Sequence, residues 1–359
     1  MTSVIIIGGG ITALSTAWFL VKTGIPVRLF YKKRLGMATQ AAGGMLSPSC
    51  EADGCSEALI TLGVRSSQMY PEWIRDIEEC SGIPCHYRAT GTLLVAMHHD
   101  QYRDLEHLAT FQLRHGLKAQ ELSKREVRMR EPNLTRQVGG LFCPDDHSIN
   151  PRSLYHSLYQ ALLNKGALIE EAAEIQVVSD EQEIVHLLVD GIQYQAEHYV
   201  LSDGAWTQAL FPLPLRPVKG QFIRLEGTDI LESVIRTPTV YCVPRAGELF
   251  LGATMEEEGF NKRNTAGPIM DLLYHTFQIL PAVYELPVLE FGSGFRPALR
   301  DNQPLIGSSP LNNCWFNTAH YRHGILIAPA AAQLFSTILQ GEKESFDFSF
   351  QRFQDISMQ

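Results

Sequence analysis

The sequence predicts a mixed α/β fold in which a parallel-sheet domain is interleaved with a second domain built on an antiparallel sheet. Three observations predict this class. A strand, a glycine-rich turn and a helix follow one another at the start of the chain, strand and helix patterns then alternate, and short β-type segments accumulate further on. No long repeat, low-complexity tract or obvious linker separates these parts, so we expect interleaved domains and not domains in series.

The first element is an apolar strand at residues 4–7 that runs into glycines and then into a helical stretch. Gly8 allows a tight turn, Gly10 lets the backbone approach a pyrophosphate, and the small Ala13 lets the helix pack on its strand. The helix N-terminus then faces the phosphates. Because a second strand follows at residues 27–30, the context predicts a Rossmann-like domain that binds a dinucleotide.

The residue at the end of this second strand departs from the dinucleotide pattern. An acidic residue is expected there, to accept hydrogen bonds from the adenosine ribose, and the chain has Tyr31. Lys32, Lys33 and Arg34 follow, and they fit either a ribose phosphate or a solvated basic turn. An NADP-linked reductase is therefore one alternative.

Length and composition indicate a globular chain of two domains. The chain has 359 residues, of which 45% are hydrophobic and 19% charged, which is enough for a large core. A formal net charge of -9 argues against a nucleic-acid partner. The apolar runs are short and interrupted, so we expect no membrane span. Since the first strand begins almost at Met1, we also expect no leader and a cytoplasmic location.

The cysteines form an odd set of seven in a large chain, which predicts free thiols. Cys50 and Cys55 share a five-residue spacing with Cys80 and Cys85. A zinc site is the alternative that this spacing raises, and we disfavour it because structural zinc sites use tighter pairs. We expect no metal.

Helix and strand signals continue along the chain in alternation. The apolar periodicity and end signals predict helices at residues 56–80, 100–115 and 123–130, one that is capped by Asn150 and ends at Gly166, and a C-terminal one with Pro329 in its first turn. The β-type segments lie at residues 91–97, 175–178, 184–189, 198–201, 218–225, 240–243, 249–252 and 289–291.

Several blocks of residues carry a family resemblance over nearly the whole chain. Besides the glycine-rich turn they are residues 40–46, 217–221, 243–245, 252–255, 296–297, 301–307, 322–324 and 328–330. With these blocks in this order, the chain resembles the FAD-dependent amine and D-amino-acid oxidase family, and within it the glycine oxidases of thiamine biosynthesis. The resemblance implies a discontinuous, Rossmann-like FAD-binding domain at residues 1–80, 145–215 and 292–359. It implies an antiparallel-sheet substrate domain at residues 81–144 and 216–291.

The resemblance also implies which residues contact FAD. A small-residue run passes the isoalloxazine ring, where glycine leaves room for a flat ring system. Ile175 lies beside the adenine, the turn at Gly204 near the phosphates, and the loop before the C-terminal helix along the pyrimidine edge. The implied FAD contacts are Gly8, Gly10, Ile11, Thr12, Ala13, Tyr31, Thr39, Gly43, Gly44, Met45, Ile175, Gly204, His323, Gly324, Ile325 and Leu326.

Two further positions depart from the family pattern. Asp203 stands where relatives carry a small or hydroxyl residue, and a carboxylate aimed at a pyrophosphate is repelled unless it points away or pairs with a base. Ala319 stands where relatives often carry glycine. Together with Tyr31, these departures raise a second alternative, a homologue with lost or altered FAD binding that acts as a non-catalytic binding protein.

Four residues are our candidates for the chemistry. Arg296 is the expected clamp on a substrate carboxylate, because a guanidinium can form two parallel hydrogen bonds with it. Tyr241 adds a phenolic hydrogen bond, Met255 lines the pocket over the ring, and Arg322 precedes the C-terminal helix. The resemblance implies oxidative deamination of glycine or another small amine, with oxygen as electron acceptor, and yields imine, then 2-oxo acid and ammonia, and hydrogen peroxide. It also implies a possible homo-oligomer.

Overall fold

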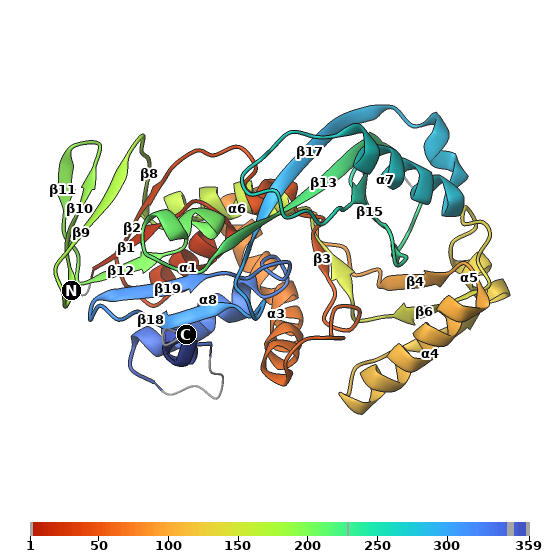
Figure 1. Cartoon of the computed structure of the whole chain (residues 1–359), viewed down its shortest axis with the longest axis horizontal. Coiled ribbons are helices and arrows are strands. Elements are labelled where there is room, and N and C mark those ends of the chain that lie inside the picture. The colour runs from red at the N-terminus through yellow and green to blue at the C-terminus, as the bar shows by residue number, and fades with distance from the viewer. Residues whose placement is uncertain (1–2, 228–229, 343–347, 357–359) are drawn as a thin grey trace.

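The computed structural model describes residues 3–227, 230–342 and 348–356. Figure 1 shows two parts, one around a sheet that carries both ends of the described chain and one around a larger sheet. The long strands β13 (Arg216–Glu226) and β17 (Val288–Ala298) reach from the second part toward the first. The predicted mixed α/β class is confirmed.

The first sheet has six strands and is parallel except for the edge strand β18, which is antiparallel to β19. In sheet order the strands are β18 (Leu305–Ser308), β19 (Cys314–Thr318), β12 (His198–Leu201), β1 (Val4–Ile7), β2 (Val27–Tyr31) and β8 (Leu168–Glu171). The strand, turn, helix and strand predicted at the start of the chain therefore lie where the motif places them.

Alternation along β1 explains how both faces of this sheet are covered, because successive side chains point to opposite faces. Val4 and Ile6 join one apolar core with the helices, and Ile5 and Ile7 join another with a small three-stranded sheet. The helices are α1 (Ile11–Lys22), α3 (Glu57–Ser81), α6 (Pro151–Asn164) and α8 (Ala328–Leu339). The small sheet consists of β9 (Ile175–Ser179), β10 (Ile184–Val189) and β11 (Ile192–Tyr194).

The second sheet has eight strands and is antiparallel except where β14 lies parallel to β4. After β17 and β13 its strands are β16 (Glu248–Gly252), β15 (Tyr241–Arg245), β14 (Val234–Arg236), β4 (Thr92–Ala96), β6 (Gly139–Cys143) and β5 (Gln120–Ser123). Its helices are α4 (His99–Arg114), α5 (Lys124–Arg130) and α7 (Ala266–Ile279). The remaining short elements are α2 (Ala38–Ala41), the pair β3 (Met45–Leu46) and β7 (His147–Ser148), and 3₁₀ turns η1 (Gly204–Ala209), η2 (Pro281–Glu285) and η3 (Phe350–Ile356).

The predicted helices lie close to the observed ones because their end signals work locally. The Ser56 hydroxyl accepts the Leu59 N–H at the start of α3, and Ser123 forms a capping box with Glu126 at the start of α5. Asn150 accepts backbone N–H groups at the start of α6, directly before a proline in its first turn. Each cap satisfies donors that a helix leaves unpaired.

The predicted strand at residues 289–291 is too short. Arg296 lies inside the eleven-residue strand β17, which pairs along its length with β13. Gly292 and Gly294 interrupt the sequence pattern that is typical of strands, because glycine has low strand propensity. The predicted strand therefore ends before them. Here they make room for neighbouring side chains, because a Cβ at Gly292 would overlap the Phe222 ring and one at Gly294 would overlap Ala41.

The chain alternates between the two sheets as the interleaved organisation predicts. The six-stranded sheet draws on segments before residue 32, between 168 and 201, and after 304, while the eight-stranded sheet draws on residues 92–143 and 216–298. One predicted boundary, between residues 291 and 292, falls inside β17. The exact domain division stays a prediction, and residues 1–2, 228–229, 343–347 and 357–359 of its ranges lie outside the described residues.

Among the described helices, none combines the length and the apolar character that are needed to cross a bilayer. All seven cysteines are free, as predicted.

Candidate functional site

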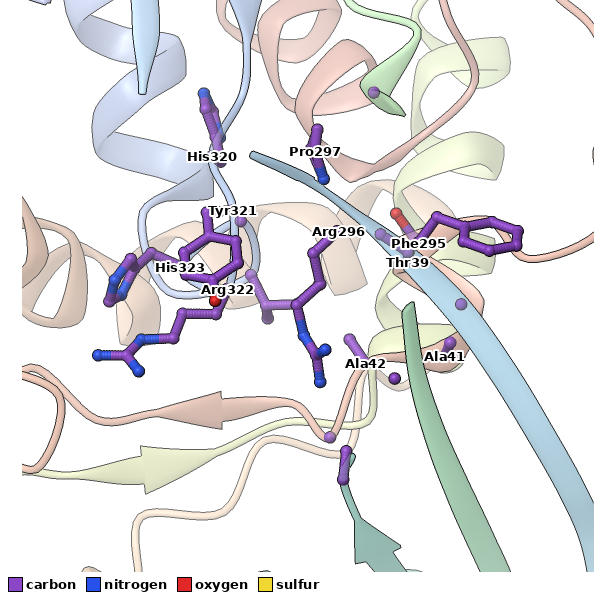
Figure 2. Close-up of a pocket in the computed structure, with 18 of the residues that line it drawn as sticks. Thr39, Ala41, Ala42, Phe295, Arg296, Pro297, His320, Tyr321, Arg322 and His323 are labelled. Carbon is purple, nitrogen blue, oxygen red and sulfur yellow. The ribbon is translucent and has the colours of Figure 1, made fainter. Parts of the chain in front are cut away.

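A cavity of about 350 Å³ lies where the carboxyl ends of β1 and β12 face the second sheet. Ligands of open α/β sheets bind at this edge. The turn before α1, the segment around α2, the turn before η1 and the loop before α8 line one side, and ends of β13, β14, β15, β16 and β17 line the other. Figure 2 shows residues from several of these segments around the hollow, among them Thr39, Ala42, Arg296 and Arg322.

The glycine-rich turn brings bare backbone to the cavity. Gly8 has a positive φ of 140°, and a Cβ there would overlap the carbonyl oxygen of Ser202, the residue directly after β12. The N-cap of α1 is Gly10, with no side-chain acceptor, and the first turn of the helix contains no acidic residue. Helix N-terminal N–H groups lack intrahelical partners and carry positive partial charge, so this end suits an anionic group.

A closed ring of hydrogen bonds joins α1 to the end of β19 and to the loop before α8. The Asn317 amide donates to the Thr16 hydroxyl at 2.9 Å, which leaves its carbonyl oxygen to accept from His320 Nε2 at 2.8 Å. Thr12 then completes the ring, with its hydroxyl 3.4 Å from His320 Nδ1 and its carbonyl bonded to Thr16. Burial lowers the pKa of His320 to about 3. The ring therefore holds a neutral imidazole at the cavity wall.

The wall at residues 42–44 requires glycine for space. A Cβ at Gly43 would lie 2.8 Å from Tyr241 Cε2, and one at Gly44, where φ is 80°, would overlap the carbonyl oxygen of Ile149. Arg245 fixes this wall from behind, because its Nη2 donates to the carbonyl oxygens of Ala42 and Gly43 at 2.7 and 2.8 Å. The segment thus presents a flat backbone surface to the cavity.

The carboxylate of Asp203 pairs with a basic side chain. This pairing offsets the repulsion that the carboxylate would otherwise exert on a bound pyrophosphate. Arg34 Nη2 donates to the Asp203 carboxylate at 3.1 Å, and the same guanidinium lies over the Trp206 ring. Burial raises the pKa of Asp203 to about 6, with Arg34 acting in the opposite direction. Of the other two basic residues after β2, Lys32 is half-buried and lines the cavity with Arg34, whereas Lys33 is exposed and lies outside the lining.

The other end of the cavity contains Arg296 and Tyr241. Arg296 Nη1 donates to the backbone carbonyls of Thr254 at 3.2 Å and Lys219 at 3.4 Å, and no ion-pair partner for it occurs among the described residues. The Tyr241 ring stacks near Phe250, and burial raises the pKa of its hydroxyl. The guanidinium is therefore held in place by carbonyl groups and keeps its charge available to a ligand.

Met255 and Tyr321 meet over this end. The Tyr321 hydroxyl donates to Met255 Sδ at 3.0 Å, although the Met255 side chain is exposed and Tyr321 is half-buried. Ala319, beside them, is fully buried with a positive φ of 60°. Glycine adopts such a backbone without strain, which explains physically why relatives can carry glycine there.

Sequence reasoning missed Glu51, which lies at the centre of a charged cluster. Its carboxylate pairs with Arg236 Nη1 at 2.6 Å and with Arg322 Nε at 2.8 Å, and His323 Nδ1 lies 4.0 Å away. Although burial opposes it, the two guanidinium groups lower the pKa of Glu51 to about 2. No local motif marks Glu51, because its partners are far away in the sequence.

The segment that presents Glu51 is held by Asp146. The buried Asp146 carboxylate accepts the backbone N–H groups of Ser49 and Cys50 at 3.0 and 2.8 Å. Cys50, Cys143 and Asp146 are close enough to form a potential metal-ligand group. This group contains only one cysteine from the two pairs that the spacing suggested, Cys50. Its carboxylate already accepts hydrogen bonds from two backbone N–H groups.

Four predicted cofactor residues lie outside the cavity lining. Gly8 packs on the backbone of Ser202, and Ala13 is fully buried inside α1. Tyr31 lies under Gly9, and burial together with the neighbouring Tyr159 of α6 raises its pKa. Ile175 packs against the core below the small sheet. The other predicted residues line it: Gly10, Ile11, Thr12, Thr39, Gly43, Gly44, Met45, Gly204, Tyr241, Met255, Arg296, Arg322, His323, Gly324, Ile325 and Leu326.

These residues fit FAD, the group that the resemblance implies. The acid-free helix end at Gly10 suits the pyrophosphate, and Asp203 does not oppose it because Arg34 neutralises the carboxylate. The wall at Gly43 and Gly44 suits a flat ring system, because side chains there would collide with neighbouring groups. The loop that leads into α8 offers its backbone at the far side of the cavity.

Comparison with known sequences agrees with this assignment. A family model described as FAD dependent oxidoreductase matches residues 3–338. The bifunctional protein ThiO/ThiG of Trichormus variabilis is 32% identical over 371 residues, which cover 98% of this chain and 55% of that protein. The chain thus spans about half the length of that bifunctional relative. The glycine oxidase of Geobacillus kaustophilus is 28% identical over 358 residues, with 96% of this chain and 95% of that protein covered.

Solved structures agree as well. The crystal structure of glycine oxidase from Geobacillus kaustophilus has a TM-score of 0.89 at 27% identity and covers 98% of this chain and 99% of that one. The glycine oxidase from Bacillus cereus has a TM-score of 0.89 at 24% identity, a likeness of fold alone, with 97% of each chain covered. The resemblance seen in the sequence is confirmed: the chain belongs to the FAD-dependent oxidoreductase family, and FAD is its cofactor.

Proposed function

We propose that this chain oxidises glycine or another small amine that bears a carboxylate. The observation that carries the proposal is the guanidinium of Arg296, which lies at the cavity end, next to the glycine wall, without an acidic partner among the described residues. The similarity to proteins named glycine oxidase supports it. FAD, when bound, supplies the acceptor for the hydride that leaves the substrate's α-carbon.

Arg296 binds the substrate carboxylate through two parallel N–H···O bonds, which fixes its orientation as well as its place. The carbonyls of Thr254 and Lys219 hold the guanidinium for this contact. Tyr241, on the neighbouring wall, adds a hydroxyl donor to the same carboxylate. Met255 and Tyr321 line this end and contact each other, so they are the side chains that a substituent on the α-carbon would meet.

The substrate amine reacts in its neutral form, because none of the described residues that line the carboxylate-binding end is a suitable base. His320 and His323 have pKa values lowered to about 3 and about 4 by burial, and Glu51 has its pKa lowered to about 2 by Arg236 and Arg322. Groups with such pKa values hold a proton poorly at neutral pH. The site therefore selects an amine that has already lost its proton to solvent.

The products that follow are an imine, then a 2-oxo acid and ammonia, with oxygen as the final acceptor and hydrogen peroxide as its product. We further propose that the reaction takes place in the cytoplasm, in a homo-oligomer, and serves thiazole formation in thiamine biosynthesis. The similarity to the protein named ThiO/ThiG supports this last point.

Peroxide release and oxygen uptake by purified holoenzyme, measured with a panel of glycine, sarcosine and small D-amino acids, test the proposal. We expect equimolar oxygen loss and peroxide gain with at least one of these amines, and no turnover of the corresponding carboxylic acids without an amine. If none of the amines supports turnover or bleaches the flavin, the proposal is wrong.

A further inference from the structure

One loop of the second part of the molecule reaches the first part beside the cavity. It is the connection between β16 and α7, and residues 256–263 of it are called the strap here. The Phe260 ring of the strap stacks on the Trp206 ring of η1, with centroids 5.2 Å apart, and meets the Phe295 ring edge-on at 5.4 Å. Because η1 follows β12 of the first sheet and Trp206 lines the cavity, this ring contact joins the two parts beside the cavity.

Groups of β13 and β17 hold the strap in this position. Glu256 and Lys219 of β13 exchange backbone N–H···O bonds of 2.9 and 3.0 Å. The Lys219 ammonium, which is fully buried, also pairs with the carboxylates of Glu256 and Glu258 at 3.1 and 3.2 Å. Towards the other end, the Ser293 hydroxyl of β17 donates to the Lys262 carbonyl at 2.8 Å. These partners are all protein groups, so we expect the strap to be closed with and without a bound cofactor.

Trp206 lies between the strap and a cation that suits a phosphate group. Arg34 lines the cavity with Trp206, and its guanidinium lies 5.1 Å from the centre of the Trp206 ring. The buried Arg34 Nε has no hydrogen-bond partner among the described residues, so a donor is left for an anionic ligand. Phe260 does not line the cavity and is 41% exposed, so it packs on Trp206 from the solvent side. The strap and Trp206 therefore form an outer wall of the cavity at the dinucleotide end.

We propose that Phe260 latches the strap onto Trp206, and that this latch must open whenever FAD enters or leaves the cavity. Phe260 acts through Trp206 and lies outside the cavity lining, so it is a positioning residue. A latch that is closed with and without FAD slows both directions alike. Its loss should therefore speed association and dissociation by the same factor and leave the Kd for FAD almost unchanged. The inference rests on FAD as the cofactor and not on the proposed substrate.

Exchange of bound FAD for an excess of isotopically labelled FAD measures the dissociation rate in the holoenzyme. We expect Phe260→Ala to exchange about tenfold faster than the unaltered protein, as the loss of one stacked ring pair implies. The Kd for FAD, measured by equilibrium dialysis of the same holoenzymes, should change far less than the rate. An unchanged exchange rate would overturn the latch. A Kd raised by the same factor as the rate would overturn it too, because the association rate would then be unaltered.

Phe277→Ala is the matched control. Phe277 of α7 is 40% exposed and its ring lies 6.0 Å from that of Tyr284, but neither residue lines the cavity. The variant should leave the exchange rate unchanged, because a ring of similar exposure is removed away from the cavity. Equal acceleration in Phe260→Ala and Phe277→Ala would show a general loosening of the second part of the molecule and would reject the latch.

Two conservative variants separate the ring from the space that it fills. Phe260→Tyr keeps the ring, and its added hydroxyl can reach solvent because the side chain is 41% exposed, so slow exchange should be retained. Phe260→Leu fills much of the space without a ring that can stack, so it should exchange faster, and it gives an independent reading if Phe260→Ala fails to fold. Fast exchange in Phe260→Tyr, or slow exchange in Phe260→Leu, would mean that stacking on Trp206 does not close the strap.

Discussion

Individual residues at the cavity act through contacts that the backbone sets in advance. The carbonyls of Thr254 and Lys219 hold Arg296, and a neutral His320 joins α1 to the loop before α8. The glycine wall is fixed by Arg245.

Replacement of Arg296 by Met should raise the substrate KM by about a hundredfold, because about 2–3 kcal/mol of charge-assisted binding is lost. Steady-state kinetics with the best amine substrate measure this, and Arg216→Gln is the control for loss of one surface cation. An unchanged KM in a variant that retains its flavin would show that the carboxylate binds elsewhere.

Gly44→Ala should destabilise the protein far more than Gly24→Ala, although both glycines have a φ of 80°. The Cβ at position 44 would overlap the Ile149 carbonyl, whereas the Cβ at position 24 meets nothing within 4 Å. For Gly24→Ala we expect the free energy of unfolding to fall by about 1 kcal/mol, from backbone strain alone. For Gly44→Ala we expect a loss of at least about 3 kcal/mol. Denaturant unfolding of both variants measures these free energies. Similar losses of stability in the two variants would refute the steric argument.

His323 should make stability fall on acidification. Its pKa is lowered from 6.5 to about 4 by burial, so between these values the unfolded chain binds a proton that the folded chain does not. Stability therefore decreases as pH falls through this window, and His323→Gln should reduce the slope by about 1.4 kcal/mol per pH unit.

Unfolding free energies of the two proteins between pH 7 and pH 4 provide the measurement. The pKa of Asp203 is raised to about 6, so that group acts in the opposite sense, and it cancels in the comparison because both proteins contain it. Identical slopes would mean that His323 titrates normally in the folded protein.

At the scale of elements, local signals set where helices begin. Asn150→Ala should cost about 1 kcal/mol of stability, because the side chain accepts two backbone N–H groups at the start of α6. Asn150→Asp keeps an acceptor and should retain most of that stability. Thermal unfolding compares the two, and equal losses would show that the cap contributes nothing.

The sequence predicted those elements whose causes are local and missed those whose causes are distant. The caps at Ser56 and Asn150 act within three residues, and the glycine-rich turn before α1 also carries its own signal. The predicted length of β17 was too short, because two of its residues are glycines. The reason for these glycines lies in distant residues, since Phe222 and Ala41 pack against them.

The residues of the site also fall into those that the sequence predicted and those that it missed. Arg296, Tyr241, Met255 and Arg322 could be predicted through family motifs, and all four line the cavity. Glu51 could not, because its bond to Arg236 joins positions 185 residues apart and neither residue stands in a recognisable motif. Tyr31 and Ile175, which the resemblance also implies, lie outside the cavity lining, and their contact with FAD stays a prediction.

In the whole molecule, the cavity forms where two sheets meet, and ion pairs hold that meeting place. Arg152 of α6 makes a two-pronged contact with Glu290 of β17, at 2.9 and 3.0 Å. Arg224 of β13 bonds to the same carboxylate at 2.5 Å. The first sheet supplies the dinucleotide end and the second supplies Arg296 and Tyr241, so neither part forms the site alone (Figure 1).

An anaerobic titration of purified holoenzyme with the amine substrate tests the central claim most directly, because it follows flavin absorption without any electron acceptor. The account predicts one FAD per chain and saturable bleaching of its visible band, at substrate concentrations about a hundredfold higher for Arg296→Met than for the unaltered protein. A protein that refuses FAD, or a flavin that no carboxylate-bearing amine reduces, would contradict it.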